Sequence, residues 1–264
     1  MRLRIKHQTA YRYGAPISRG HQLVRLFPSI HAGVSVMSWQ VSAQGAYVGQ
    51  PFADGLGNQC ALVDMNEGAE TVVIAVEGFV ETHDAGPILQ GALETLPPAY
   101  FLRETPLTAA DANIRALMKP AASAAETAEV LMHAVRDRLD FRAGVTDVTH
   151  PAAEALAQGA GVCQDHAHLY VAAARAMGLP ARYVSGYLFA GESHVASHAW
   201  VEARTEGGWL GLDPANRVRV GAAYVRLAAG LDYQQACPVA GVRIGGAEET
   251  LAVAVEVRDQ RQEQ

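Results

Sequence analysis

Cysteine is scarce in this chain of 264 residues, and its placement does not suggest disulfides. The three cysteines, Cys60, Cys163 and Cys237, are odd in number and far apart, unlike a disulfide framework. Long apolar runs are missing too: residues 1–7 lack the continuous apolar core of a secretion signal, and no segment is long enough to span a bilayer. We therefore expect a cytoplasmic protein, because a reducing compartment would also protect a reactive thiol.

Positive charge is limited as well. The 21 Lys and Arg residues are outnumbered by 27 Asp and Glu, and the net charge of −6 is spread along the chain without a basic stripe. This argues against nucleic acid as the main partner and gives no attraction to anionic membranes. No calcium-loop motif is present, and nothing indicates a cofactor or an oligomeric state. A chain of this length can bury a substantial core, as one large or two small domains.

The first part of the chain is typical of a small antiparallel β domain. Leu3 and Ile5 alternate with charged residues, and residues 71–82 form a long valine-rich run. The alternation in residues 34–41 slips by one position, which indicates a β-bulge. Pro97, Pro98 and Pro106 then separate this strand-rich part from a part with helical patterns. We predict a β domain at 1–92, a linker at 93–108 and a second domain at 109–264.

Helical patterns dominate the start of the second domain. Thr108 and Ser123 each begin a four-residue pattern of the capping-box type, which satisfies free N–H groups at a helix start. Strands are predicted at 181–189, 197–204 and 209–213, with a last β run at 251–257. The predicted fold class is α+β, with a long helix packed against an antiparallel sheet.

The most informative segment surrounds Cys163. A glycine two residues before it and an apolar stretch after it place this thiol in the first turn of a helix, which Gly178 and Pro180 end. The helix is apolar nearly all round, so it should be buried. A thiol attacks only as the thiolate, and a free cysteine has a pKa of about 8.5. Unpaired N–H groups and the dipole at a helix start favour negative charge on sulfur.

Two further polar residues lie on what should be a β-hairpin. His198 is in the first strand and Asp213 ends the second, with the turn at residues 205–208. If the loop holds an even number of residues, the two side chains project from the same face, opposite or diagonal to each other. Asp213 could then orient the imidazole while His198 takes the thiol proton. An odd loop or a bulge would break this arrangement.

Two other interpretations of these residues are open at this point. Each of the three could be structural, because free cysteine often packs as a small buried hydrophobe. A zinc site is the sharper competitor, since His166, His168 and His194 lie near Cys163 and His198 in sequence. However, position 168 is turned well away from 163 on a helix, and no Cys-x-x-Cys or His-Glu-x-x-His element is present.

Three segments of the chain, residues 161–187, 197–203 and 208–214, closely resemble the transglutaminase-like superfamily of papain-type cysteine enzymes. More narrowly, the chain resembles bacterial transglutaminase-like proteins with an extra N-terminal domain. The resemblance implies a papain-like core and a catalytic triad of Cys163, His198 and Asp213. Two elements depart from the family pattern. Leu56 replaces an aromatic residue in the turn at 54–58, and Leu231 stands where the family has an arginine before Asp-Tyr.

We therefore expect a cysteine nucleophile that attacks an amide and forms a thioester, with a peptide or protein as substrate. Hydrolysis is our first choice, and acyl transfer to an amine would use the same thioester. A non-catalytic binding module on the same fold is the third possibility. The backbone N–H of Cys163 is the natural oxyanion donor. Gln164 and Trp200 are candidates for the second donor.

Overall fold

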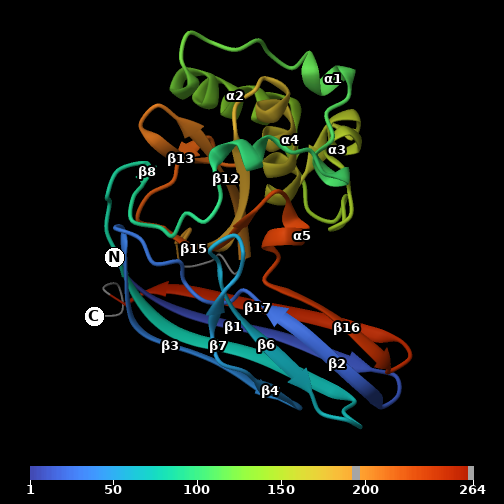
Figure 1. The fold of residues 1–264 in the computed structure, drawn as a ribbon. Coiled ribbons are helices and arrows are strands. Elements are labelled where there is room, and N and C mark those ends of the chain that lie inside the picture. Colours follow the sequence, from blue (N-terminus) through green and yellow to red (C-terminus); the bar gives the residue numbers. More distant parts are fainter. Residues whose placement is uncertain (192–196, 261–264) are drawn as a thin grey trace.

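The computed structural model describes residues 1–191 and 197–260. A β-sandwich forms the lower part of Figure 1, and a sheet covered by helices forms the upper part. The α+β class predicted from the sequence is confirmed. Within the described residues, no helix is long and apolar enough to cross a membrane.

The lower region is a sandwich of two antiparallel sheets. Their strand orders are β17-β1-β7-β3 and β16-β2-β6-β4, with β5 paired to β6. The strands are β1 (Arg2–Tyr13), β2 (Ile17–Val24), β3 (Val34–Gln44), β4 (Ala46–Val48), β5 (Phe52–Ala53), β6 (Gln59–Met65), β7 (Thr71–Thr82), β16 (Val239–Gly245) and β17 (Glu249–Asp259). Alternate residues of β1 and β7 are buried, as the sequence pattern predicts. The register of β3 against β7 shifts between Val36 and Ser38, which confirms the predicted bulge.

The end of the chain belongs to this sandwich and not to the region that precedes it. β17, which contains the predicted run at 251–257, pairs with β1, and β16 pairs with β2. The predicted second domain at 109–264 had placed both strands with the helical region. Val255 and Val257 of β17 are buried in the sandwich core. Sequence periodicity identifies such a strand but not its partner, because pairing is set by the global packing.

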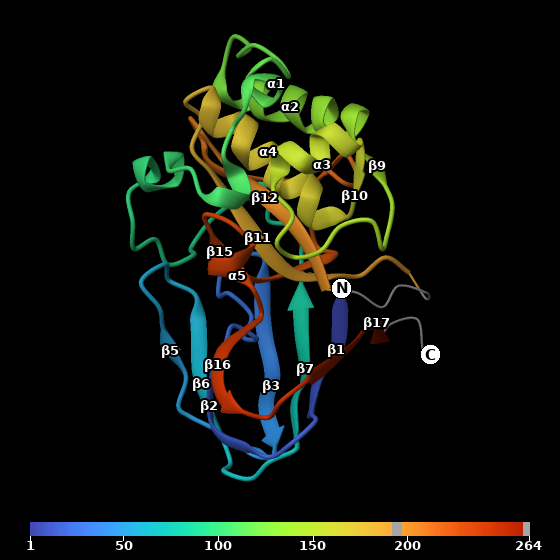
Figure 2. The same ribbon diagram turned by 90° about the vertical axis from the view of Figure 1, so that its right-hand side faces the viewer.

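The upper region has a curved antiparallel sheet with helices on one side (Figure 2). The sheet order is β14-β13-β12-β11-β15, and β8 pairs with β13. Its strands are β8 (Ile88–Leu89), β11 (Ala181–Leu188), β12 (Ser197–Thr205), β13 (Gly208–Asp213), β14 (Val218–Arg219) and β15 (Tyr224–Gly230). β9 (Asp140–Phe141) and β10 (Ala160–Gly161) form a separate short parallel pair. The three strands predicted between residues 181 and 213 therefore exist, with bounds that differ by one residue at most.

The helices gather around the predicted central helix, α4. They are η1 (Pro98–Leu102), η2 (Pro106–Thr108), α1 (Ala112–Arg115), α2 (Ala124–Arg138), α3 (Ala152–Gln158), α4 (Cys163–Ala176) and α5 (Tyr233–Ala236), where η marks a 3₁₀-helix. α4 packs against β11 and β12 on one side and against α2 and α3 on the other. Twelve of its residues, from Gln164 to Arg175, are buried, so the prediction of a buried helix is confirmed.

Only one of the two predicted capping boxes starts a helix where expected. The hydroxyl of Ser123 accepts a hydrogen bond of 3.1 Å from the Glu126 amide at the start of α2. α1 begins later than predicted, because Asp111 is its cap and accepts from the Ile114 amide at 2.8 Å. Thr108 instead ends the 3₁₀-turn η2, where a proline occupies the first position.

The two regions share a hydrophobic core. Tyr187 at the end of β11, and Val225 and Leu227 of β15, pack among the buried residues of the sandwich. His7 of β1 reaches across the same boundary, where its Nδ1 lies 2.9 Å from the Tyr187 hydroxyl. The sheet of the upper region is therefore built directly onto the sandwich.

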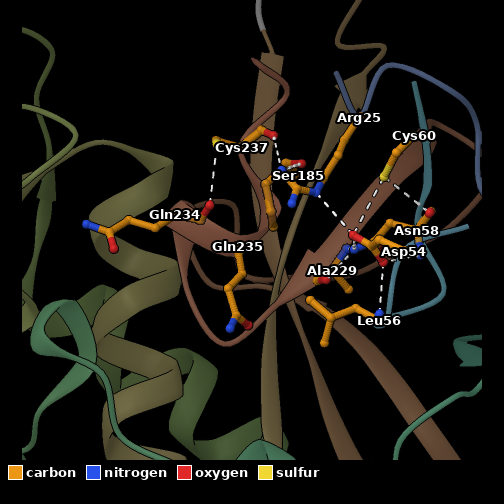
Figure 3. A network of polar contacts seen from close by, with 12 residues as sticks. Arg25, Asp54, Leu56, Asn58, Cys60, Ser185, Ala229, Gln234, Gln235 and Cys237 are labelled. Carbon is orange, nitrogen blue, oxygen red and sulfur yellow. Dashed lines mark hydrogen bonds and ion pairs between the residues drawn. The ribbon is translucent and has the colours of Figure 1, made fainter. Parts of the chain in front are cut away.

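A turn of the sandwich is bonded to the edge of β15 (Figure 3). Asp54 holds the turn closed by accepting hydrogen bonds from the Leu56 and Asn58 amides, both at 2.9 Å. The Asn58 amide group donates to the Ala229 carbonyl at 2.9 Å and accepts from the Ala229 N–H at 2.8 Å. Arg25 forms an ion pair with Asp54 at 3.3 Å. Asn58 is 1% exposed. Its side chain bonds both backbone groups of Ala229, as a residue of a neighbouring strand would.

Candidate active site

Cys163 is the first residue of α4, as predicted. The preceding residue caps the helix: the Val162 N–H donates to Asp165 Oδ2 at 2.7 Å. Gly161 makes room for this contact, because a Cβ at this position would lie 2.5 Å from the same oxygen. The capping carboxylate and the glycine together fix the first turn, in which the N–H groups have no partner within the helix.

His198 and Asp213 meet across the hairpin of β12 and β13. Thr205 pairs with Gly208, so the loop has two residues and the even count required by the sequence argument holds. Val201 pairs with Leu212, and with this register His198 lies diagonally across from Asp213 on the same face. The His198 Nε2 and Asp213 Oδ2 atoms are 2.6 Å apart. The Cys163 side chain interacts with the same imidazole and raises its pKa. The structure therefore brings all three residues together.

Asp213 is surrounded by hydrogen-bond donors. Its Oδ1 accepts from the Ala215 and Asn216 amides at 3.0 and 3.1 Å. Its Oδ2 accepts from the Asn216 side chain at 2.7 Å and from the Tyr224 hydroxyl at 2.8 Å, besides His198. Because every one of these groups donates, the side chain is held as a carboxylate although it is fully buried. Sequence analysis missed Asn216 and Tyr224, and Tyr224 lies on β15, beyond any local motif.

The electrostatics of the three residues favour a charged imidazole. Burial alone lowers the pKa of His198, but the hydrogen bonds to Asp213 and Cys163 raise it from 6.5 to about 10. Burial raises the pKa of Asp213, and the contacts with His198, Asn216 and Tyr224 more than reverse this, so its pKa lies below the ordinary value. With Nε2 donating to Asp213, the Nδ1 atom of His198 is the ring nitrogen left to face the thiol.

The two side chains predicted as possible second oxyanion donors have different surroundings from each other. The Gln164 amide donates one of its two N–H groups to the Val148 carbonyl at 3.2 Å. The Trp200 ring lies nearly parallel to that of His198, with the planes 24° apart and the centroids at 6.4 Å, and meets the Tyr224 ring edge-on at 5.4 Å. The Trp200 ring therefore packs beside the imidazole of His198.

Residues that the zinc hypothesis invoked make other contacts. The two ring nitrogens of His166 face the Val162 and Leu139 carbonyls at 2.8 and 3.1 Å. His168 Nε2 accepts from the Tyr233 amide at 3.1 Å, deep in the core. His194 lies outside the described residues. In the described part of the chain, no three His, Cys, Asp or Glu side chains are grouped so that they could hold a metal ion.

The other cysteines have surroundings unlike that of Cys163. Burial and the nearby Asp54 raise the pKa of Cys60 to about 12. Burial likewise raises the pKa of Cys237, which lies beside α5 (Figure 3). Both are free and buried, whereas Cys163 is partly exposed.

Beyond Trp200, the same face of β12 carries a buried ionic group. The Glu202 carboxylate forms ion pairs with two arginines, Arg182 of the neighbouring strand β11 and Arg226 of β15, which lies beyond β11 in the sheet. Burial raises the pKa of Glu202, but the two guanidinium groups outweigh this and lower it to about 2. This group fixes three adjacent strands of the sheet that supports His198.

Comparison with protein families gives two matches. Residues 112–214, which include Cys163, His198 and Asp213, match the model of the transglutaminase-like superfamily. Residues 3–81 match the bacterial transglutaminase-like N-terminal region. The match at 3–81 covers strands of the sandwich, and the match at 112–214 covers helices α1 to α4 and strands β11 to β13.

Whole-chain relatives and one solved structure agree with these matches. An uncharacterized protein of Mycobacterium leprae is 30% identical over 97% of this chain and 98% of its own. One of Mycobacterium tuberculosis (strain H37Rv) is 28% identical over 97% of this chain and 92% of its own. The crystal structure of a protein from Cytophaga hutchinsonii, described as a "putative cysteine protease", aligns with a TM-score of 0.70 and 18% identity over 98% of this chain and 90% of the other. At that identity the likeness shows the shared fold.

Proposed function

Because the chain belongs to the transglutaminase-like superfamily and carries its N-terminal region, we propose that it is a cysteine enzyme that hydrolyses amide bonds through a thioester. Cys163 is the nucleophile, His198 the acid and base, and Asp213 the residue that orients the histidine. A peptide or protein is the substrate. The observation that carries the proposal is the 2.6 Å contact of His198 with a buried carboxylate, together with the effect of Cys163 on the pKa of the same imidazole.

In the acylation step, the Cys163 thiolate attacks the amide carbonyl carbon. The negative charge that develops on the carbonyl oxygen is stabilised by the Cys163 N–H, at a helix start where the amides have no partner within the helix. The carbon–nitrogen bond then breaks, and the His198 imidazolium gives its Nδ1 proton to the leaving amine. The products of this step are a thioester on Cys163, a free amine and a neutral imidazole.

In the deacylation step, the neutral imidazole takes a proton from the incoming nucleophile. When water attacks, the carbon–sulfur bond breaks, a carboxylic acid leaves, and the thiolate–imidazolium pair is restored. When a primary amine attacks instead, the same steps yield a new amide, which is the transglutaminase reaction. The alternative to hydrolysis is therefore acyl transfer on the same residues.

The first test compares the alkylation rates of the three cysteines by iodoacetamide from pH 5 to pH 9, resolved by peptide mass spectrometry. Cys60 and Cys237 serve as controls within the same molecule. We expect Cys163 to react fastest below pH 8 and to lose at least about tenfold in rate in the His198→Ala variant. His198→Gln, which can still donate to Asp213, controls for the structural effect of the substitution and should be equally slow.

The test has a clear contrary outcome. If Cys163 of the folded protein reacts no faster than a small free thiol, and His198→Ala leaves its rate unchanged, the protein is a binding module on this fold. If Cys163 is reactive, incubation of peptides with and without a primary amine separates hydrolysis from transfer, because the two products differ in mass.

A further inference from the structure

A loop segment wraps the first turn of α4. This segment, residues 141–150, is called the strap below. The Gln164 side-chain amide donates to the Val148 carbonyl at 3.2 Å, and the Thr146 hydroxyl donates to Asp165 Oδ2 at 2.7 Å. At its other end the strap continues from β9, where Phe141 pairs with Gly161 just before the helix. The strap is therefore fixed to the helix by backbone and side-chain contacts.

The strap contacts three of the four positions around this turn. Successive residues of a helix are rotated by about 100°. The strap meets Gln164 through Val148, Asp165 through Thr146, and His166 through the Phe141 ring, whose centroid lies 6.1 Å from that of the imidazole. Only the direction of Cys163 remains. Its two neighbouring directions around the helix are those of His166 and Gln164, so the two ends of the strap attach to the helix positions on either side of the nucleophile.

Each of these ends carries a large apolar side chain that is about half exposed. Phe141 is 53% exposed and Val148 is 50% exposed. Of the residues between them in the strap, only Val145 has an apolar side chain of similar size, and it is less exposed than Phe141 and Val148. Shortening either side chain leaves the main anchors in place, since Val148 is held through its carbonyl and the backbone of Phe141 through the pairing of β9 with β10. Apolar surface of this kind beside a nucleophile gains free energy when an apolar group covers it.

We propose that Phe141 and Val148 form the two walls of a subsite for an apolar group next to the reacting carbonyl. The proposal rests on the function proposed above and names its substrate class: peptides or amides with an apolar side chain beside the bond that is cleaved. A charged side chain in this place would lose hydration without gaining a partner. Because the strap is anchored to the helix that carries Cys163, the subsite keeps a fixed position relative to the nucleophile.

The test uses two alkylating agents with the same reactive group, iodoacetamide and N-benzyl iodoacetamide. Their rate ratio at Cys163 is divided by their ratio for a small free thiol, which removes intrinsic reactivity. Contact of the phenyl group with about 40 Å² of apolar surface corresponds to a preference of about fivefold. We expect this preference in the native protein and a ratio close to one in the Phe141→Ala, Val148→Ala double variant.

Two controls make the result specific. The rate with iodoacetamide alone should be the same in native and variant protein, because neither substitution touches His198 or Asp213. Val242→Ala removes an apolar side chain that is 74% exposed on β16, in the sandwich, and should leave the ratio unchanged. Phe141→Tyr keeps a ring against His166 and should keep most of the preference.

The outcomes separate this inference from the proposed function. A reactive Cys163 without any benzyl preference, or with a preference that survives the double variant, overturns the subsite and leaves the nucleophile in place. A Cys163 that reacts like a free thiol with both reagents overturns the proposed function and the subsite with it.

Discussion

Replacing Asp213 by asparagine should disable the site while leaving most of its atoms in place. The carboxylate accepts five hydrogen bonds, three of them at Oδ2 from His198, Asn216 and Tyr224. Asparagine can offer only one oxygen. With that oxygen on the two backbone amides, its NH₂ group faces three other donors. The His198 Nε2–H then has no acceptor, and the imidazolium loses the carboxylate with which it forms an ion pair.

The size of the effect follows from the geometry. The His198–Asp213 contact is 2.6 Å long, and the two side chains are 10% and 0% exposed, so solvent screens it little. A hydrogen bond of this ionic type contributes about 1.5–3 kcal/mol. Since 1.36 kcal/mol corresponds to a tenfold change, we expect Cys163 of Asp213→Asn to alkylate about 10- to 100-fold more slowly near neutral pH.

The loss of the His198–Asp213 interaction should also change how the unfolding free energy depends on pH. In the native protein the pKa of His198 is raised from 6.5 to about 10. Its contribution to stability is therefore complete below pH 6.5 and is lost as the pH rises through 10. Without Asp213 the pKa of His198 falls by roughly one to two units, so the variant should lose this contribution at correspondingly lower pH.

The assay is iodoacetamide alkylation of Cys163 at pH 7, with urea unfolding from pH 6 to 10 to follow stability. Asn216→Ala is the matched control, because it removes one side-chain donor and keeps the carboxylate, and it should change the rate by less than about threefold. If folded Asp213→Asn alkylates at the native rate, the carboxylate does not support the imidazolium and the reasoning is refuted.

Three further predictions concern the scaffold. Asn58→Ala should lower the unfolding free energy by about 2–4 kcal/mol, because it leaves the buried N–H and C=O of Ala229 in β15 without a partner. An unchanged urea midpoint would contradict a stabilising role for these two hydrogen bonds. Gly161→Ala should cost about 1–3 kcal/mol by crowding Asp165, whereas Gly221→Ala, with open space around its Cβ, should have little effect on melting temperature; equal effects would refute the steric argument. Glu202→Gln should cost about 3–5 kcal/mol at pH 7. Its pKa of about 2 lies below the ordinary 4.5, so the difference should shrink as the pH falls below 4.5 toward 2; a difference that stays constant from pH 7 to 3 would exclude the ionic cause.

Much of the candidate site could be predicted from local sequence. α4 begins at Cys163 because a glycine and an N-terminal acidic residue favour a helix start there, and glycine and proline end it near residue 178. The two-residue turn of the β12–β13 hairpin sets a register in which His198 and Asp213 share a face. Both inferences depend on contacts between residues close together in the chain, for which periodicity and turn chemistry are sufficient.

Other parts of the site depend on segments that are far apart. Tyr224 reaches Asp213 from β15, although β15 lies on the far side of β11 and β12 in the sheet order. The strap reaches α4 through contacts of Val148 and Thr146, which carry no recognisable motif. Thr108 has the sequence of a helix cap but is recruited into a 3₁₀-turn, because Pro106 begins that turn first.

The sequence by itself determined which residues can carry the chemistry: a thiol at a helix start and a histidine and a carboxylate on one hairpin face. It also determined that the run at 71–82 is a strand and that β3 contains a bulge. Only the tertiary structure decided that β17 closes the sandwich against β1, that Asn58 borders β15, and that the strap is fixed to the first turn of α4. The physical reason is that alternation and capping are short-range preferences of the backbone. The pairing of strands some 240 residues apart is chosen by which arrangement buries the most apolar surface for the whole chain.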